Sequence, residues 1–402
     1  MAKLGLQDLE LKDKRVLVRV DFNVPLDENG HITDETRITA SLPTLRYILS
    51  QGGKPILMSH LGRPKGVRNE RLSLKPCAEA LSFYLAIPVH LAPDCIGPLV
   101  EKMAQEMGQD EVLLLENLRF HRGEEHPDEE PGFAGQLAKL GDVYVDDAFG
   151  TAHRAHASTV ACAKLFPTTA AAGCLLAAEL RFLGEALLHP KRPFVALIGG
   201  AKVSTKLGVL KALSRKVDTL LIGGGMAYTF LKARGIEVGG SLVEDDALDQ
   251  ARLIMEECLK SGVTLLLPED LVIAAEFKNE TLAEIVPTRE GIPKGWQGLD
   301  IGPATVRGWI PLLKAAATIF WNGPVGVFEF PQFARGTFEI AKILTECDGI
   351  TIVGGGDSLA AVNASGLADQ IDHLSTGGGA ALEFIEYGHL PGVDALTDIE
   401  RC

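Results

Sequence analysis

The stretch FVALIGGAKVSTK, residues 194–206, combines two features from which the fold can be predicted. Its first five residues, Phe194–Ile198, are apolar at every position rather than at alternate positions. Such a run suits a strand that is buried on both faces, as in a parallel sheet covered by helices. Two glycines follow the run directly, and they allow a ligand to approach the backbone closely.

The same unit recurs in both halves of the chain: a short apolar run, a polar or glycine-rich tip, and a helix-like stretch. The runs cover residues 16–22, 55–60, 112–117 and 143–148 in the first half, and residues 194–200, 219–225, 264–268, 318–323 and 350–356 in the second. Strands and helices that alternate in this way predict an α/β fold. Ligands of open α/β sheets bind beyond the carboxyl ends of the strands, so we expect functional residues at these tips.

A domain boundary is predicted between the two sets of runs. Residues 168–188 are rich in Ala, Leu and Glu, which are strong helix formers. The stretch ends at HPKRP, residues 189–193, whose two prolines stop a helix and stiffen a connection. At 402 residues the chain is longer than one core usually supports. We therefore expect two Rossmann-like domains, each a parallel sheet flanked by helices, over residues 1–188 and 189–386, joined by a hinge helix.

The composition restricts the classes of partner. A formal net charge of −14 argues against a broad nucleic-acid surface, so any anion site must be a local basic cluster. Apolar stretches such as residues 168–180 are too short and too weakly apolar to span a membrane. The charged N-terminal sequence has no secretory signal, and seven scattered cysteines without a CxxC pair suggest reduced thiols. We therefore expect a cytoplasmic protein.

The tips of the first half carry Asp, Asn, His and Arg side chains. In RVDFNVP, residues 19–25, Asp21 and Asn23 are two residues apart at the end of a strand, so their side chains share a face. They could bind the hydroxyl and carboxylate of a small acid, or they could form an Asx-turn that leads into Pro25. This motif alone leaves both interpretations open.

A cationic group is expected beside these two residues. In SHLGRPKG, residues 59–66, a strand delivers His60, Gly62 frees the backbone, and Arg63 presents a planar guanidinium that suits a carboxylate or phosphate. A lone His–Arg pair is more often part of a solvated surface. A functional role is favoured because three further arginines have similar positions after strands or in loops, namely Arg37, Arg119 and Arg154.

The tips of the second half carry glycines and lysines. The loop GGAKVSTK, residues 199–206, differs from the Walker A pattern, but its glycines would likewise expose backbone N–H groups at a helix N-terminus and favour a phosphate. Lys202 and Lys206 are four residues apart, which predicts that both amines lie on one face of the start of that helix. Two lysines are unfavourable at the positive end of a helix, so chance or function must explain them, and we favour function.

Three further tips carry candidate nucleotide or metal ligands. In GGGDS, residues 354–358, Asp357 could hold Mg²⁺ together with substrate phosphates, or it could cap the following helix. The glycines of STGGGA, Gly377, Gly378 and Gly379, open a helix-like stretch over residues 380–386 and form a second candidate phosphate cradle. In WNGPVGVFE, residues 321–329, an apolar wall is followed by Glu329, which could accept hydrogen bonds from ribose hydroxyls.

Eight motifs together resemble the phosphoglycerate kinase family, in order and across nearly the whole chain. They are RVDFNVP, SHLGRPKG, LLENLRFH, DAFGTAHRAHAS, GGAKVSTK, WNGPVGVFE, GGGDS and STGGGA. The resemblance implies reversible, Mg²⁺-dependent phosphoryl transfer from 1,3-bisphosphoglycerate to ADP, which gives 3-phosphoglycerate and ATP. It also implies a monomer whose chain end, residues 387–402, packs on the N-terminal domain.

The resemblance also assigns site residues. The N-terminal domain would bind 3-phosphoglycerate or its bisphosphate through Asp21, Phe22, Asn23, Arg37, His60, Leu61, Gly62, Arg63, Arg119 and Arg154. The C-terminal domain would bind MgADP or MgATP through Lys202, Lys206, Gly225, Asn322, Gly323, Pro324, Val325, Glu329, Gly355, Gly356, Asp357 and Ser358, with Asp357 on the metal. Ser358 stands where the family has Thr, and either hydroxyl can face a phosphate.

The implied mechanism needs alignment and charge neutralisation rather than a general base, because carboxylate and ADP oxygens are already nucleophilic. The transferred phosphoryl group carries charge on its three equatorial oxygens. We assign the neutralisation of that charge to Arg37, Lys202 and Lys206, helped by Mg²⁺ and the helix end at Gly377–Gly379. Because the two ligands would bind to different domains, closure about residues 168–193 must bring them together and exclude water.

Two other classes of protein compete with this interpretation. A non-catalytic metabolite-binding protein on the same fold would be expected to lose Arg37, a lysine or Asp357, yet all are present. Another two-domain α/β enzyme, such as a different acyl-phosphate kinase or a dehydrogenase, would not need the arginine cluster with His60. The glycine loops also lack the GxGxxG pattern of a nicotinamide site.

Overall fold

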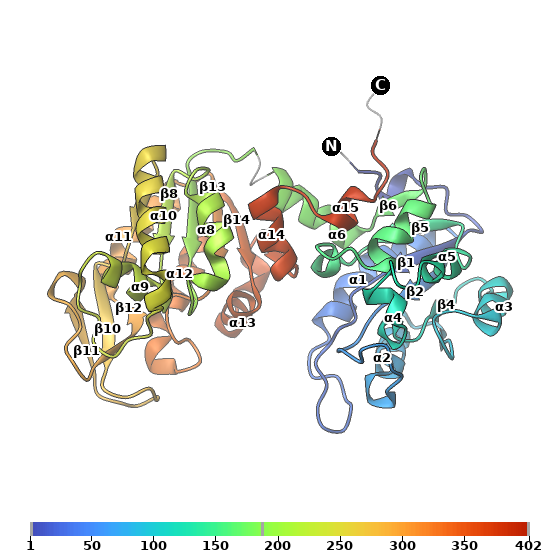
Figure 1. Ribbon diagram of the computed structural model, residues 1–402, viewed down its shortest axis with the longest axis horizontal. Helices are drawn as coiled ribbons and strands as arrows, with labels where there is room; N and C mark the ends of the chain where they lie inside the picture. Colours follow the sequence, from blue (N-terminus) through green and yellow to red (C-terminus); the bar gives the residue numbers. More distant parts are fainter. Residues whose placement is uncertain (1–2, 186–188, 400–402) are drawn as a thin grey trace. The chain divides into compact units, whose positions relative to one another are not determined.

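The computed structural model describes residues 3–185 and 189–399 (Figure 1). The chain divides into two compact units. The first runs to Leu180 and resumes at His389, and the second is Arg181–Gly388. The boundary predicted after residue 188 falls on residues 186–188, which lie outside the described residues.

The first unit contains a six-stranded parallel sheet in the order β3-β4-β2-β1-β5-β6. Its strands are β1 (Arg15–Arg19), β2 (Lys54–Met58), β3 (Val89–Leu91), β4 (Val112–Leu114), β5 (Val143–Asp146) and β6 (Ala170–Ala172). Its α-helices are α1 (Thr36–Ser50), α2 (Lys75–Leu85), α3 (Pro98–Glu106), α4 (Arg122–Glu125), α5 (Gly132–Ala138), α6 (Cys174–Glu179) and α15 (Pro391–Asp394).

The second unit contains another six-stranded parallel sheet, in the order β15-β14-β13-β7-β8-β9. Its strands are β7 (Phe194–Ile198), β8 (Thr219–Ile222), β9 (Thr264–Leu266), β13 (Thr318–Asn322), β14 (Ile350–Gly354) and β15 (His373–Ser375). Its α-helices are α8 (Leu207–Leu213), α9 (Met226–Ala233), α10 (Leu248–Ser261), α11 (Pro303–Ala315), α12 (Arg335–Thr345), α13 (Gly356–Ser365) and α14 (Gly379–Tyr387).

Burial on both faces explains why the central strands are apolar throughout. In β1, Val16 and Val18 pack with Ile38 and Leu45 of α1 in one core cluster. Leu17 points to the opposite face, because strand side chains alternate, and it is also fully buried. The second unit repeats this arrangement, with α11 and α12 packed on one face of its sheet. The predicted α/β class is confirmed, and each of the nine predicted runs contains a strand.

Four parts of the fold escape the sequence prediction. The edge strands β3, β6 and β15 are only three residues long. A small antiparallel sheet, in the order β11-β10-β12, joins β10 (Asp270–Ala274), β11 (Ala283–Pro287) and β12 (Gln297–Ile301). Residues of β11 are half-buried or exposed, so that strand lacks the apolar run that marks the parallel strands.

The prediction of a single helix over residues 168–188 is wrong at its start. Ala170–Ala172 form β6, which pairs in parallel with β5. Helix α6 follows, and Leu180–Glu185 form a π-helical turn. Alanine has the highest helix propensity, but propensity is a weak preference, and pairing with β5 satisfies the backbone here.

The chain end packs on the first unit. Thr397 donates its N–H to Ala170 O at 2.9 Å, and its carbonyl accepts from Leu4 N at 2.8 Å. Gly392 donates to Ala152 O at 2.8 Å, where an added Cβ would lie 2.9 Å from Ala152 Cα. The segment from His389 onward therefore supports β6 and the loop that contains Ala152.

Candidate active site

A cavity of about 170 Å³ lies beyond the carboxyl ends of the strands of the first unit. Side chains and backbone from five segments surround it: the loops after β1, β2, β4 and β5, and the first turn of α1. The lining residues are Asp21, Asn23, Arg37, His60, Gly62, Arg63, Arg119, Gly150, Thr151 and Arg154. Eight residues that the sequence singled out are therefore brought together.

Asp21 and Asn23 both face this cavity, as their spacing predicts. Asn23 Oδ1 accepts a hydrogen bond from Gly62 N at 2.9 Å, so it joins the β1 loop to the β2 loop. The turn that was the alternative interpretation also forms, since Asn23 N donates to Asp21 Oδ1 at 3.3 Å. The two interpretations are compatible.

Arg37 is paired with the only carboxylate among the lining residues. Its Nη1 is hydrogen-bonded to Asp21 Oδ2, and its side chain is 37% exposed. Arg37 lies in the first turn of α1, where the positive end of the helix disfavours a cation. Because the guanidinium of Arg37 is partly exposed, it can contact an anionic ligand in the cavity in addition to Asp21.

His60 is a neutral hydrogen-bond donor toward the cavity. Its Nδ1 lies 3.3 Å from Arg19 Nη2, and a guanidinium can only donate, so Nδ1 accepts and the proton is on Nε2. Burial, and then the charge of Arg19, hold the pKa of His60 well below its usual range. The side chain is only 4% exposed, which keeps the ring in place.

A buried polar network supports this arrangement from below. Arg19 is fully buried at the end of β1 and donates from Nε to Ser158 Oγ at 2.8 Å. Ser158 in turn donates from its hydroxyl at 2.6 Å and from its backbone at 2.9 Å to the carboxylate of Glu124. Burial raises the pKa of Glu124, while Arg19 and Ser158 lower it. A buried cation, Arg19, and a buried carboxylate, Glu124, thus lie beneath His60 and are bridged by Ser158.

Arg119 and Arg154 complete the cationic side of the cavity. Arg119 donates from Nη1 to Gly62 O at 2.8 Å, and its Nε lies 3.2 Å from Glu125 Oε1. Burial lowers the pKa of Arg119, which nevertheless remains a cation because its ordinary value is so high. Arg154 is half-buried, and Arg63 is exposed. Four arginines and one carboxylate give the cavity a net positive charge.

Two predicted substrate residues have side chains elsewhere. Phe22 and Leu61 are buried in the core of the first unit, and the N–H of Phe22 and the carbonyl of Leu61 are bonded to Ser59 Oγ and Asn117 Nδ2. The sequence prediction missed the lining residues Gly150 and Thr151, and also Arg19 and Glu124 beneath the cavity. An arginine inside the apolar run VLVRV, residues 16–20, was the available signal for Arg19, because arginine is rarely buried without a partner.

In the second unit, the glycine loops meet at the carboxyl edge of the sheet. Gly199 donates to Asn322 O at 2.9 Å, Gly200 to Pro324 O at 2.8 Å, and Gly224 to Val325 O at 3.1 Å. A Cβ at position 199 would lie 2.2 Å from Pro324 O. The loops therefore approach each other more closely than any side chain would allow. Gly225 follows as the N-cap of α9.

Lys206 is held against this edge, whereas Lys202 is exposed. Lys206 Nζ donates to Gly199 O at 2.8 Å and to Asn322 O at 2.9 Å. Burial lowers its pKa to about 8, and the charge of Asp357 partly offsets that effect. The prediction that both lysines lie on one helix face is wrong: α8 begins at Leu207, and Lys202 precedes the short 3-10 turn Ser204–Lys206. The bend at Gly200, with φ of +96°, delays the helix.

The loop after β14 presents one carboxylate. Asp357 is exposed in the first turn of α13, and the N-cap is Gly355, so the capping interpretation of Asp357 is wrong. Gly355 has φ of +92°, and a Cβ there would lie 2.8 Å from Asn322 Nδ2. Asn322 itself is buried and donates from Nδ2 to Gly354 O at 2.8 Å. Ser358 is also buried, and its hydroxyl accepts from Gly323 N at 2.5 Å, so it braces the loop.

The remaining predicted positions border the same edge. Gly377 and Gly378 follow β15, and α14 begins at Gly379, which confirms the helix predicted there. A Cβ at Gly378 or Gly379 would meet nothing within 4 Å, so the start of α14 is open. Glu329 is exposed in the turn before the 3-10 helix Pro331–Phe333.

Comparison with known proteins decides the family. A family model described as phosphoglycerate kinase matches residues 6–388. The chain belongs to the phosphoglycerate kinase family. The predicted family and enzyme class, a phosphotransferase with a carboxyl group as acceptor, are therefore confirmed.

Several members of the phosphoglycerate kinase family match along their full length. The phosphoglycerate kinase of Moorella thermoacetica is 57% identical over 398 residues, which cover 99% of this chain and 100% of the relative. The cytosolic phosphoglycerate kinase of Nicotiana tabacum is 54% identical over 397 residues, with 98% of each chain covered. A solved structure of phosphoglycerate kinase from Coxiella burnetii has a TM-score of 0.88 at 39% identity, over 98% of both chains.

The helices also bear on membrane association. Among the described residues, no helix is both long enough and apolar enough to cross a bilayer.

Proposed function

We propose that this chain binds 3-phosphoglycerate or 1,3-bisphosphoglycerate in the arginine-lined cavity of the first unit, and MgADP or MgATP at the glycine loops of the second. The observation that carries the proposal is the convergence of Arg37, Arg63, Arg119 and Arg154 with His60 around one cavity. In the reaction, the acyl phosphate of the bisphosphate passes to ADP.

The charge of the first cavity fits a small acid with two anionic ends. Arginine forms paired hydrogen bonds with phosphate or carboxylate, and four arginines exceed what one phosphate needs. His60 adds an uncharged Nε2–H donor, and Asp21 and Asn23 add acceptors for a hydroxyl hydrogen. A three-carbon acid with a phosphate at one end and a carboxylate or acyl phosphate at the other would use all of these groups.

The second unit offers backbone donors instead. The N–H groups of Gly199, Gly200 and Gly224 are already bonded to neighbouring loops, so donors for phosphate oxygens would come from the openings of α13 and α14, at the favourable end of each helix dipole. Lys206 and Lys202 would supply positive charge to the transferred phosphoryl group, and Glu329 could accept from ribose hydroxyls. This set suits a nucleoside diphosphate or triphosphate.

The residues present fit a magnesium ion that arrives with the nucleotide. Mg²⁺ usually takes one or two protein carboxylates and completes its shell with phosphates and water. Asp357 is an exposed carboxylate near Lys206, which matches that need. When bound, the ion would neutralise charge on the nucleotide phosphates.

The protein contributes alignment and charge to the transfer. Carboxylate and ADP oxygens attack without a general base, so Arg37 and Lys202 need only stabilise the charge on the equatorial oxygens of the phosphoryl group. Because the two ligand sites belong to different units, we propose that turnover includes closure about residues 168–193, which excludes water. We further propose a monomeric, cytoplasmic enzyme, in agreement with the word "cytosolic" in the name of the tobacco relative.

Formation of ATP from 1,3-bisphosphoglycerate and ADP with Mg²⁺ tests the proposal. We expect rapid turnover that EDTA abolishes and that Lys202→Ala reduces by at least about 100-fold, the usual effect of removing a group that stabilises transition-state charge. Melting temperatures with each ligand serve as the control, because a ligand raises stability only if it binds the native state. If both ligands raise the melting temperature but no ATP forms, the protein binds these ligands without catalysing the transfer.

A further inference from the structure

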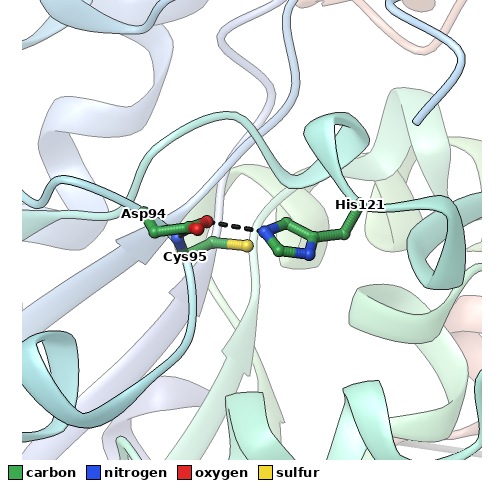
Figure 2. A group of neighbouring side chains, drawn as sticks. All are labelled: Asp94, Cys95 and His121. Atoms are coloured by element: carbon green, nitrogen blue, oxygen red, sulfur yellow. Dashed lines mark hydrogen bonds and ion pairs between the residues drawn. The ribbon is translucent and has the colours of Figure 1, made fainter. Parts of the chain in front are cut away.

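Three side chains with metal-binding donor atoms meet in the first unit, away from the lining of the arginine cavity. Asp94 and Cys95 point toward the imidazole of His121 (Figure 2). A carboxylate oxygen, the thiol sulfur and a ring nitrogen all lie within 4.8 Å of one another. Asp94 Oδ1 and His121 Nε2 are 2.6 Å apart. The family assignment and the proposed reaction leave these three residues without a role.

The three donors come from two segments that the sheet fixes in place. Asp94 and Cys95 belong to the loop between β3 and α3. This loop is anchored by Ala92 N, which donates to Leu114 O at 2.8 Å, and by Arg68, which donates to Pro93 O at 2.7 Å. His121 lies between the 3-10 helix Leu118–Phe120 and α4, and its ring is stacked on Phe133 with centroids 5.4 Å apart.

The donor set selects the class of metal. One thiolate, one imidazole and one carboxylate are ligands of Zn²⁺ and its neighbours, whereas Mg²⁺ and Ca²⁺ prefer oxygen alone. A thiolate and a carboxylate together carry two negative charges, so a divalent ion would make the cluster neutral. Neutrality matters here because Cys95 is fully buried, and a buried net charge is costly.

The geometry requires only small movements. Tetrahedral zinc with bonds of about 2.0–2.3 Å places its ligand atoms roughly 3.3–3.8 Å apart. The hydrogen bond between Asp94 and His121 would open by about 1 Å, and the sulfur would move by a similar distance. The side chains of His121 and Asp94 are 24% and 43% exposed, so an ion and a water ligand can reach the cluster from solvent.

We propose that Asp94, Cys95 and His121 form a three-ligand site for a divalent transition metal of the zinc type, with water in the fourth position. The bound ion would replace the Asp94–His121 hydrogen bond and link the β3–α3 loop to the segment that begins α4. Arg119 is two residues before His121, so the ion would also stiffen the chain that carries this arginine.

Surrounding charges act in both directions. Arg68 interacts with the charge of Asp94 and so opposes a bound cation, and it is in turn paired with Glu70 at 2.8 Å. Glu116 lies 3.9 Å from Arg68, and the buried Glu124 is close enough to act on Cys95. Burial raises the pKa of the Cys95 thiol well above its usual range, so a metal must displace a proton there.

Titration of the full chain with Co²⁺ after chelator treatment tests the site, because Co²⁺ takes zinc positions and gives a thiolate-to-metal charge-transfer band. We expect the band at one equivalent of Co²⁺, its displacement by Zn²⁺, and a melting temperature that rises with Zn²⁺. In Cys95→Ser the charge-transfer band should disappear. In His121→Gln the affinity for Co²⁺ should fall at least about tenfold, because even the loss of a group that only orients a metal ligand usually costs that much.

Cys347→Ser is the matched control, because Cys347 is a half-buried thiol in the second unit. That variant should bind Co²⁺ as the original chain does. The proposal is wrong if no charge-transfer band forms, or if the band and the Zn²⁺-dependent rise in melting temperature persist in Cys95→Ser. Should Cys95→Ser fail to fold, His121→Gln decides the question, because its partly exposed position tolerates the change: unaltered Co²⁺ affinity would overturn the proposal.

Discussion

The arginine cavity of the first unit and the glycine edge of the second, formed by the loops after β7, β8, β13 and β14, both lie at the carboxyl ends of their strands. They differ in the groups that line them. The cavity presents side chains: four arginines, an imidazole, a carboxylate and an amide. The edge is formed by the main chain of loops that approach each other too closely to leave room for a side chain. One architecture therefore carries two different sets of polar groups, to which we assign two different anionic ligands, and the sequence of the strand tips decides which set forms.

The two sites also differ in what keeps them in place. The cavity depends on buried charge, since Arg19 and Glu124 lie beneath it and orient His60. The edge depends on the absence of side chains, since a Cβ at position 199 or 323 would collide with the neighbouring loop. Substitutions that add atoms should therefore damage the edge, and substitutions that remove charge should damage the cavity.

The largest effect is expected for Arg19→Met. Loss of the guanidinium leaves the buried carboxylate of Glu124 without its cation, and breaking such a pair usually costs about 3–5 kcal/mol of the free energy of unfolding. Denaturant unfolding measures this loss. The double variant Arg19→Met/Glu124→Gln should lose less than the sum of the two single variants, because neither charge is then left alone. Strict additivity would show that the two residues do not act as a pair.

Arg37→Ala should lower turnover far more than it weakens nucleotide binding. Removing one group that stabilises transition-state charge costs about 2.7–4 kcal/mol, or roughly 100- to 1,000-fold in kcat. The affinity for ADP should stay within about twofold, because Arg37 belongs to the other unit. Steady-state kinetics measure kcat, and calorimetric titration measures the affinity for ADP. Normal turnover would remove Arg37 from the catalytic group.

Gly199→Ala should damage the glycine edge alone. The added methyl group would lie 2.2 Å from Pro324 O, and overpacking of this kind costs about 1–3 kcal/mol. Relief of the clash would displace the loop that borders the proposed nucleotide site, so we expect weaker ADP binding, by up to about 150-fold if the whole cost falls on the bound state, with unchanged binding of 3-phosphoglycerate. Gly135→Ala is the matched control, because nothing lies within 4 Å of a Cβ there. Equal effects of the two substitutions would contradict the steric account.

The smallest effect is a dependence of ADP binding on pH. Burial lowers the pKa of Lys206 to about 8. The protonated amine attracts phosphate, so affinity should be full below pH 8 and should fall by at most about tenfold per pH unit above it, since one proton is lost. Lys206→Arg keeps its charge over this range and should flatten that fall. If ADP affinity falls equally with pH in the original chain and in Lys206→Arg, the titrating group is not Lys206.

Sequence patterns predicted nine strands of the two parallel sheets, most of which are buried on both faces. The nine runs were recognisable because each contains several consecutive apolar residues, and the segments after them, together with Arg37, gave the eight cavity residues from Asp21 to Arg154. The three-residue strands β3 and β15 each contain a histidine and no continuous apolar run, whereas the equally short β4 and β9 lie in longer apolar runs. The antiparallel sheet was missed because β11 is half-exposed.

Other features depend on contacts between distant segments. Arg19 and Glu124 are 105 positions apart and are joined only through Ser158, so no local pattern links them. The helical spacing of Lys202 and Lys206 was misleading, because Lys206 bonds to the carbonyls of Gly199 and Asn322 and the helix starts after it. The alanines of β6 favour a helix by propensity and form a strand because β5 offers an open edge.

The central claim is that each unit holds a different ligand, and crossed calorimetric titrations test it most directly. Arg63 and Lys202 are both exposed, so Arg63→Ala and Lys202→Ala should fold normally. We predict that Arg63→Ala weakens binding of 3-phosphoglycerate by at least about tenfold and leaves MgADP unchanged, and that Lys202→Ala does the reverse; charge-assisted hydrogen bonds of about 1.5–3 kcal/mol set this scale. If either variant weakens both ligands equally, or if the pattern is exchanged, the assignment of one ligand to each unit is wrong.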